Sequence, residues 1–221
     1  MKQIHAVDLA VRARLQHLPK KLMKKGKFIT LYGINNIGKS TQCKILMDNL
    51  KKHGYDAVYL KYPVYSIEPS GVYINNVLRN SGGKQNISED ELQMWYTINR
   101  YQFEPELKQM LQEGKIVVAE DYTATGLAWG SAKGASLEWL MEINKYLMKE
   151  DFAIYLKGKR NTAAREANHI HESNDDLLEA CQFIYDNLAV KFNWEKINIK
   201  PSIGETADVI WEAVHQYLKN N

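Results

Sequence analysis

Cysteine is scarce in this sequence of 221 residues. Cys43 and Cys181 are the only two cysteines, and neither belongs to a Cys-x-x-Cys pair or to a Cys/His spacing that binds metal. This scarcity argues against a disulfide framework and against a zinc site built on cysteine. We expect two buried or idle thiols in a reducing compartment, and therefore a cytoplasmic protein.

Long apolar segments and a strong charge of one sign are also missing. No apolar stretch approaches the ~20 residues needed to cross a bilayer, so the sequence predicts no membrane partner. The formal net charge is +3, and 25% of the residues are charged. This mild positive charge suits anionic substrates, whereas a nucleic-acid-binding domain usually concentrates more positive charge on one face. We therefore expect small-molecule substrates and no nucleic-acid partner.

Residues 1–26 are rich in Lys and Arg and poor in acidic residues. They lack the continuous apolar segment of a secretory signal, although their composition also resembles that of an organellar transit peptide. Apolar residues recur every three or four positions, which favours a surface helix: Ile4, Val7, Val11, Leu15 and Leu18. We interpret this segment as an N-terminal helical extension.

From residue 27 onward, short β-prone segments alternate with helical patterns. Strands are expected at residues 28–32, 57–60, 116–119, 152–156 and 196–199, and helices at 39–53, from 88 onward, 175–192 and 205–218. Segments such as 116–119 show no polar alternation, which suits strands buried on both faces of a parallel sheet. The alternation predicts a three-layer α/β/α fold with a parallel sheet. The polar residues 161–176 are the best candidate for a mobile lid, which we place at about 158–175.

The helix expected from residue 88 has a recognisable beginning. Ser88 can cap it, and Glu91 stands three residues later as the partner of a capping box. Pro105 lies near its middle and is expected to kink or interrupt it, because proline lacks a backbone N–H and its ring collides with the preceding turn.

The strongest motif has the pattern G-x-x-x-x-G-K-[ST] and reads Gly33-Ile34-Asn35-Asn36-Ile37-Gly38-Lys39-Ser40, followed by Thr41. Its glycines let the backbone wrap a phosphate, and amide groups at the helix N-terminus point at the anion. Lys39 adds positive charge near the transferred phosphate, and the Ser40 hydroxyl is placed to ligate Mg²⁺. The motif therefore predicts a P-loop that binds ATP and Mg²⁺.

A P-loop alone does not distinguish a kinase from a GTPase or a motor. No Asp-x-x-Gly follows an expected strand, and no Asn-Lys-x-Asp motif for reading a guanine base occurs. These absences argue against a GTPase. The small size and the polar lid segment favour a nucleoside monophosphate kinase, and we expect residues 27–221 to form its kinase domain.

Four motifs in order resemble the thymidylate kinase family, and the resemblance covers nearly all of the chain after residue 27. They are residues 33–42 (GINNIGKSTQ), Lys61-Tyr62-Pro63, Asn99-Arg100-Tyr101 and residues 120–129 (EDYTATGLAW). The resemblance implies an ATP- and Mg²⁺-dependent kinase that converts dTMP to dTDP. It also implies a homodimer that pairs through helices.

The resemblance assigns roles to the side chains that would hold the acceptor nucleotide. Lys61 would contact the acceptor phosphate, Tyr96 would stack on the pyrimidine and Arg100 would hydrogen-bond its carbonyl edge. Trp129 would close off the sugar 2′ position and favour deoxyribose, and Tyr122 lies in the same motif. Each also has a structural interpretation. Tyr96 and Arg100 can be a core aromatic beside a surface arginine, and Trp129 can be plain core packing.

The sequence departs from the family pattern in the P-loop and after the third strand. Asn35 and Asn36 stand where the family commonly has a carboxylate and, in some members, an arginine. Glu120 stands at the family's aspartate and Asp121 at its arginine, but a shift of one residue would make Asp121 the aspartate. Either carboxylate can help to hold Mg²⁺ through water, or can merely cap the strand end. We predict that Asp121 turns toward the metal or pairs with a lysine or arginine.

The lid segment is also unusual. Arg160 and Arg165 are its only arginines available to stabilise the transferring phosphoryl group. We therefore take Lys39, Glu120, Asp121 and Arg165 as the catalytic set, and Ser40, Glu120 and Asp121 as the metal set. His169 and His171 superficially resemble a zinc pair, although such a pair in a polar segment is more often solvent-facing.

The sequence thus predicts phosphorylation of a deoxypyrimidine monophosphate, with dTMP as the expected acceptor. Two other functions stay open at this point. The altered residues at Asn35 and Asp121 are compatible with another or a modified nucleoside monophosphate. They are also compatible with a weakly active homologue that binds nucleotide as a structural or regulatory ligand.

Overall fold

The computed structural model describes residues 25–79, 87–159 and 175–221, and these residues contain a single five-stranded parallel sheet. The strands are β1 (Lys27–Tyr32), β2 (Ala57–Lys61), β3 (Ile116–Glu120), β4 (Phe152–Lys157) and β5 (Glu195–Asn198). Their order across the sheet is β2-β3-β1-β4-β5. The central strand β1 pairs with β3 on one side and with β4 on the other. Because every strand is parallel, all carboxyl ends meet at one edge.

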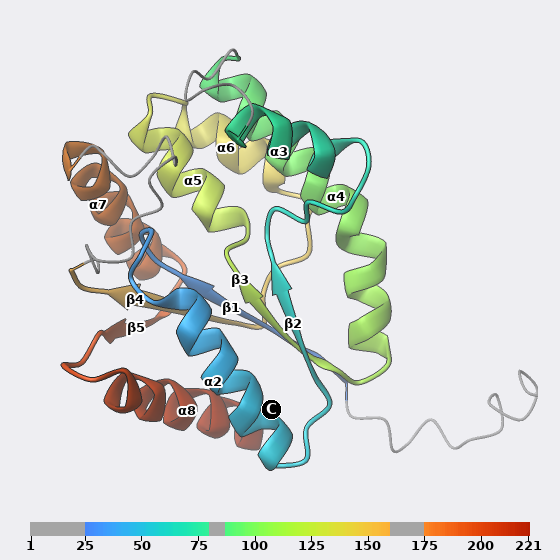
Figure 1. Ribbon diagram of the computed structural model, residues 1–221, viewed down its shortest axis with the longest axis vertical. Helices are drawn as coiled ribbons and strands as arrows, with labels where there is room; N and C mark the ends of the chain where they lie inside the picture. Colours follow the sequence, from blue (N-terminus) through green and yellow to red (C-terminus); the bar gives the residue numbers. More distant parts are fainter. Residues whose placement is uncertain (1–24, 80–86, 160–174) are drawn as a thin grey trace, which may run out of the picture.

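Helices cover both faces of this sheet, which makes three layers (Figure 1). Helix α2 (Lys39–Lys52) and helix α8 (Ile203–Asn220) lie side by side against one face. Helix α4 (Glu89–Gln112) contacts β3 and helix α7 (Asp175–Lys191) contacts β4 from the other side. The predicted α/β/α fold with a parallel sheet is therefore confirmed.

Three helices were not expected from the sequence. They are α3 (Ser70–Arg79), α5 (Thr123–Ala132) and α6 (Leu137–Asn144), and they surround the first half of α4. Helix α5 contains Gly126 and Gly130 and buries residues all round, so it has no polar stripe to reveal it. Tertiary packing between α4, α6 and α7 stabilises this helix where intrinsic propensity would not.

Helix α4 runs from Glu89 to Gln112 without a break through Pro105. We expected Pro105 to kink or interrupt the helix, and the expected interruption was wrong. Proline removes one hydrogen bond to the carbonyl of the residue four positions earlier, which is Tyr101. Tyr101 lies on the exposed side of the helix, where water can hydrogen-bond to that carbonyl instead.

The beginning of α4 confirms the predicted Ser88 cap but shows no capping box, because the Glu91 side chain bonds α3 instead. The Ser88 side chain accepts a hydrogen bond from the Glu91 backbone N–H at 3.1 Å. The Glu91 carboxylate accepts a hydrogen bond from the Tyr73 hydroxyl, and this bond ties α4 to α3. The cap fixes where α4 begins, and hence which of its residues face the carboxyl edge of the sheet.

Several predictions fall on residues that the structure does not describe. The helical extension at 1–26 lies outside the described residues except for Lys25 and Gly26, and the lid lies outside them from 160 to 174. Arg160, Arg165, His169 and His171 belong to that part. Among the described residues, no helix is both long and apolar enough to span a membrane.

Candidate active site

A cavity of about 660 Å³ opens at the carboxyl edge of the sheet. The loop after β1, the ends of β2 and β3, the first half of α4, helix α5 and the start of α8 contribute to its wall. Most of the predicted site residues line it: Asn35, Asn36, Ile37, Gly38, Lys39, Ser40, Thr41, Lys61, Tyr96, Arg100, Glu120, Asp121, Tyr122 and Trp129. The fold therefore brings the phosphate motif and the predicted acceptor residues to one cavity.

The loop between β1 and α2 has the backbone geometry of an anion cradle. Gly38 has φ = 100°, a conformation that favours glycine, and a Cβ there would meet nothing within 4 Å. Asn36 also has a positive φ of 62°. Helix α2 begins at Lys39 without a side-chain cap, so its first N–H groups are left for a ligand. These groups, together with the positive end of the helix dipole, suit a phosphate.

The Lys39 side chain is buried beside this loop, with 5% of it exposed. Its Nζ donates to the carbonyls of Gly33 and Ile34 at 2.8 and 3.0 Å. It also lies 3.6 Å from Oδ1 of Asp121. The ammonium group is therefore held between two carbonyls of the P-loop and one carboxylate.

Glu120 is the last residue of β3, and three side chains meet its carboxylate. Ser40 Oγ donates to it at 2.7 Å, the Tyr59 hydroxyl at 2.5 Å and Lys61 Nζ lies 3.0 Å away. Burial acts to raise the pKa of Glu120, but the hydrogen bond from Tyr59 and the charge of Lys61 outweigh it and lower that pKa. Glu120 is therefore held as a carboxylate next to the P-loop serine.

Asp121 follows directly and adopts φ = 64°, so its side chain turns away from the line of the strand. Its Oδ1 accepts a hydrogen bond from Thr125 Oγ1 at 2.9 Å and pairs with Lys39. Burial raises the pKa of Asp121, against the opposing charge of Lys39. The prediction that Asp121 pairs with a lysine or arginine is confirmed, and both neighbouring carboxylates lie at the site.

The predicted acceptor residues Tyr96 and Arg100 lie one turn apart on α4 and line the same cavity. Arg100 is 4% exposed, so it is not a surface arginine. Its Nη1 donates to Asn144 Oδ1 at 3.0 Å, and its buried Nε has no hydrogen-bond partner among the described residues. Burial lowers the pKa of the Arg100 guanidinium and raises that of the Tyr96 hydroxyl.

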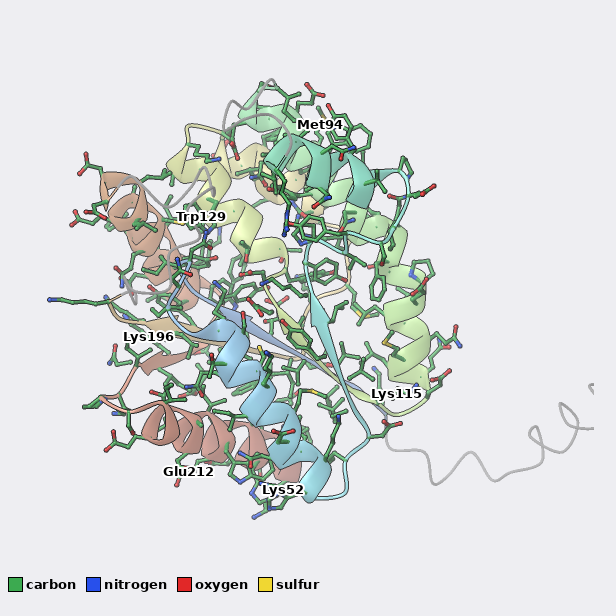
Figure 2. The ribbon with its side chains drawn as sticks, in the orientation of Figure 1. Lys52, Met94, Lys115, Trp129, Lys196 and Glu212 are labelled. Atoms are coloured by element: carbon green, nitrogen blue, oxygen red, sulfur yellow. The ribbon has the colours of Figure 1, made fainter. Side chains whose placement is uncertain are left out.

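Two aromatic residues complete the predicted set. Trp129 projects from α5 and is 7% exposed at the cavity wall (Figure 2). Tyr122 is fully buried, packs against Phe28 and Tyr62, and donates its hydroxyl to the Met148 carbonyl at 3.0 Å. Because the Tyr122 hydroxyl is already bonded within the core, only its ring is available to contact a ligand in the cavity.

A match to the family model described as thymidylate kinase extends over residues 31–210. The chain belongs to the thymidylate kinase family. A probable thymidylate kinase from Thermococcus onnurineus is 33% identical over 209 residues, which cover 87% of this chain and 99% of the relative. The thymidylate kinase of Danio rerio is 29% identical over 202 residues, or 89% and 90% of the two chains. The chain is accordingly an enzyme of the phosphotransferase class.

A solved structure of thymidylate kinase from Candida albicans has the same fold. Its TM-score is 0.75 at 19% sequence identity, with 89% of this chain and 94% of that chain covered. The thymidylate kinase resemblance inferred from the four motifs is thus confirmed by sequence relatives and by fold.

Sequence reasoning missed several residues at the cavity wall, among them a connected polar group of three: Glu89, Gln93 and Lys133. Glu89 and Gln93 fall at spacings of four, three and four residues with Tyr96 and Arg100, which places all four on one face of α4. That polar stripe was a signal available in the sequence. Lys133 follows α5, a helix whose position only the tertiary structure reveals.

Proposed function

We propose that this member of the thymidylate kinase family transfers the γ-phosphoryl group of ATP to dTMP, releasing ADP and dTDP. The observation that carries the proposal is the single cavity that reaches from the P-loop to Tyr96 and Arg100. Phosphoryl transfer between two nucleotides needs such a cavity, because donor and acceptor phosphates must meet in line with little covalent help from the protein.

The donor end suits ATP with Mg²⁺. The uncapped N-terminus of α2 supplies amide donors for phosphate oxygens. Ser40, Glu120 and Asp121 supply hard oxygen atoms, and two carboxylates together with substrate phosphates are a donor set that Mg²⁺ prefers. No group of three or more His, Cys, Asp or Glu side chains in the described part of the chain could hold a metal ion. That finding suits a metal held mainly by the nucleotide, where it would neutralise phosphate charge.

Each lysine of the site would contact one of the two phosphate groups that take part in the transfer. Lys39 would leave its carbonyl partners to contact the transferring phosphoryl group. Lys61 is half-exposed, so it can exchange Glu120 for the acceptor phosphate. Both moves place positive charge where negative charge develops, without a covalent intermediate.

At the acceptor end, residues of α4 would bind the pyrimidine and residues of α5 would contact the sugar. Tyr96 would stack on the base and Arg100 would donate to a carbonyl oxygen of the base. Trp129 would fill the space that a 2′-hydroxyl needs, and so favour deoxyribose.

A coupled ADP-release assay over a panel of ribo- and deoxynucleoside monophosphates tests this function. We expect the highest kcat/KM with dTMP and strict dependence on Mg²⁺. Equal and slow turnover with every acceptor would contradict the proposal and support a nucleotide-binding homologue.

The domain boundary and the lid are part of the proposal. We propose that residues 27–221 are the kinase domain and that Arg165, in a lid at about 158–175, stabilises the transferring group. Deletion of residues 1–26 should leave ATP binding largely unchanged, because the strand that leads into the P-loop, β1, begins at Lys27. Loss of ATP binding in a folded truncated protein would place the extension in the site.

The proposed role of the lid arginine is tested by kinetics. Arg165→Ala should lower kcat far more than it raises the KM for dTMP.

We also propose a homodimer and a cytoplasmic location. Helix α4 exposes Met94, Ile98 and Tyr101 at spacings of four and three residues, and Figure 2 shows Met94 on the outside of the molecule. Such a stripe suits a helical dimer interface. Light scattering should give the mass of a dimer, and Ile98→Glu should give a monomer. Cell fractionation would test the location.

A further inference from the structure

Gln93, one turn before Tyr96 on α4, is buried with 2% of its surface exposed, yet it lines the cavity. Its Nε2 donates to Glu89 Oε1 at 2.8 Å. The other oxygen of that carboxylate accepts from Lys133 Nζ at 3.0 Å. A carboxylate can only accept hydrogen bonds, so the Gln93 side chain must turn its NH₂ group toward Glu89. Its amide oxygen then points away from Glu89.

That oxygen has no hydrogen-bond partner among the described residues. A buried carbonyl oxygen without a donor is unfavourable, so the apo structure leaves a place for a donor at this point. The same holds for the buried Nε of Arg100, two turns further along α4. The wall of the cavity thus presents an unsatisfied acceptor and an unsatisfied donor.

The Gln93 oxygen and the guanidinium end of Arg100 converge on α5, which carries a glycine where they approach it; the Arg100 atom concerned is Nη2, not the unsatisfied Nε. A Cβ at Gly126 would lie 2.8 Å from Gln93 Oε1 and 3.0 Å from Arg100 Nη2. Both atoms therefore lie within 3.0 Å of one point. A ligand edge that carries an N–H beside a carbonyl oxygen would satisfy the two groups together.

We propose that Gln93 is a specificity-determining residue of the acceptor site, held by the Glu89–Lys133 pair so that its oxygen accepts the N3–H of thymine or uracil. The inference rests on the proposed function. The imide edge of these bases offers N3–H next to the C4 carbonyl, which Arg100 would bind. Cytosine offers the opposite pattern, with a lone pair on N3 and an amino group on C4. It would face Gln93 with an acceptor and Arg100 with a donor, which disfavours its binding.

Glu89 and Lys133 are positioning residues in this scheme, since they act through the Gln93 amide. With the Glu89 carboxylate removed, the amide is free to turn and present its NH₂ group to the base. Selectivity between thymine and cytosine would then fall, while the P-loop end would be unaffected.

The first test uses the wild-type enzyme and four acceptors: dTMP, dUMP, N3-methyl-dTMP and dCMP. A site that hydrogen-bonds N3–H should reject the analogues that lack this donor by about 100-fold or more in kcat/KM. We expect dUMP to stay close to dTMP. An N3-methyl-dTMP or dCMP that is phosphorylated as well as dTMP would overturn the inference without any variant.

The second test compares variants whose folding is checked by thermal unfolding. Gln93→Met keeps the size of the side chain and removes the acceptor, so it should reduce the dTMP/dCMP ratio of kcat/KM about 10-fold or more through the KM for dTMP. Gln102→Met is the matched control, because Gln102 lies on the same helix and bonds the Glu68 carbonyl. An unchanged ratio in folded Gln93→Met protein would overturn the inference.

A double-variant comparison separates positioning from a merely structural role. Glu89→Gln should lower the dTMP/dCMP ratio in the wild-type background and leave it unchanged in the Gln93→Met background. Equal reductions in both backgrounds would exclude action through Gln93. Absence of dTMP phosphorylation in the wild-type enzyme, with turnover of another monophosphate, would instead overturn the proposed function itself.

Discussion

The two ends of the cavity differ in how the side chains that would contact the ligand are paired. At the phosphate end, two lysines and two carboxylates form ion pairs: Lys39 with Asp121 at 3.6 Å and Lys61 with Glu120 at 3.0 Å. The amide atoms Asn36 Nδ2 and Gln42 Oε1 at that end are buried without a hydrogen-bond partner in the described part of the chain. At the base end, buried atoms of Gln93 and Arg100 lack a hydrogen-bond partner among the described residues.

The difference indicates two ways of binding a ligand. Phosphates must displace existing ion pairs, so their binding releases carboxylates that need a new partner, which suits a metal ion. The base only has to bind groups that lack a hydrogen-bond partner, so a base with a matching pattern of donors and acceptors binds more tightly than one without it. We therefore expect the phosphate end to control the rate of transfer and the base end to control the choice of acceptor.

Removal of the P-loop lysine should have the largest effect. Lys39→Ala takes positive charge from the transferring phosphoryl group, and we expect kcat to fall by about three orders of magnitude or more. Lys52→Ala is the control, because Lys52 lies exposed at the other end of α2. Steady-state kinetics with dTMP measure the loss, and circular dichroism checks the fold. Unchanged turnover in Lys39→Ala would remove the P-loop from the mechanism.

A charge reversal beside that lysine should be nearly as severe. Asp121→Arg replaces an attraction to Lys39 by a repulsion, and each is worth about 4 kcal/mol for charges ~4 Å apart at an effective dielectric near 20. We expect loss of activity, measured as kcat with dTMP.

The neutral variant of the same residue tests the metal role. Asp121→Asn should raise the Mg²⁺ concentration needed for half-maximal activity. Asp186→Asn is the control, since Asp186 pairs with Lys157 and Lys196 away from the lining of the cavity. An unaltered Mg²⁺ requirement in Asp121→Asn would refute the metal role.

A change at the base end should act on binding of one substrate only. Arg100→Ala removes a charge-assisted hydrogen bond worth about 1.5–3 kcal/mol, so the KM for dTMP should rise roughly 10- to 100-fold. The KM for ATP should stay within about twofold, because the P-loop is untouched. Initial rates with each substrate varied in turn give both constants. Equal effects on the two substrates would place Arg100 outside the acceptor site.

The smallest expected effect concerns stability and separates the two neighbouring carboxylates. The pKa of Glu120 is lowered in the fold, so its charge stabilises the protein above about pH 4.3, the ordinary value for Glu, and this stability is lost as the pH falls through the lowered pKa. The pKa of Asp121 is raised, so its charge destabilises the fold above that raised pKa, and the cost vanishes below about pH 3.9.

Opposite signs should therefore appear at pH 7 in the ligand-free protein. We expect Glu120→Gln to lower the free energy of unfolding and Asp121→Asn to raise it, each by about 1 kcal/mol. Urea unfolding at pH 7 and at pH 4 measures both, and the Glu120→Gln difference should shrink at the lower pH. Changes of the same sign at pH 7 would show that the Lys39 partnership outweighs the burial of Asp121.

Local sequence was sufficient to predict the phosphate end. The P-loop is eight consecutive residues between a strand and a helix, and its chemistry resides in backbone amides and one lysine. The β3 segment and the two carboxylates at its end, Glu120 and Asp121, were equally predictable. Which lysine each carboxylate pairs with was not readable, because those pairs join residues from different strands and loops.

The base end was decided by tertiary structure. Glu89 and Lys133 are 44 positions apart, and they meet only because α5 packs against α4 where Gly126 and Gly130 allow close approach. Helix α5 lacks an amphipathic pattern, so no periodicity in the sequence reveals it. A contiguous motif carries its own geometry, whereas a site assembled from two packed helices exists only once their burial has fixed their distance.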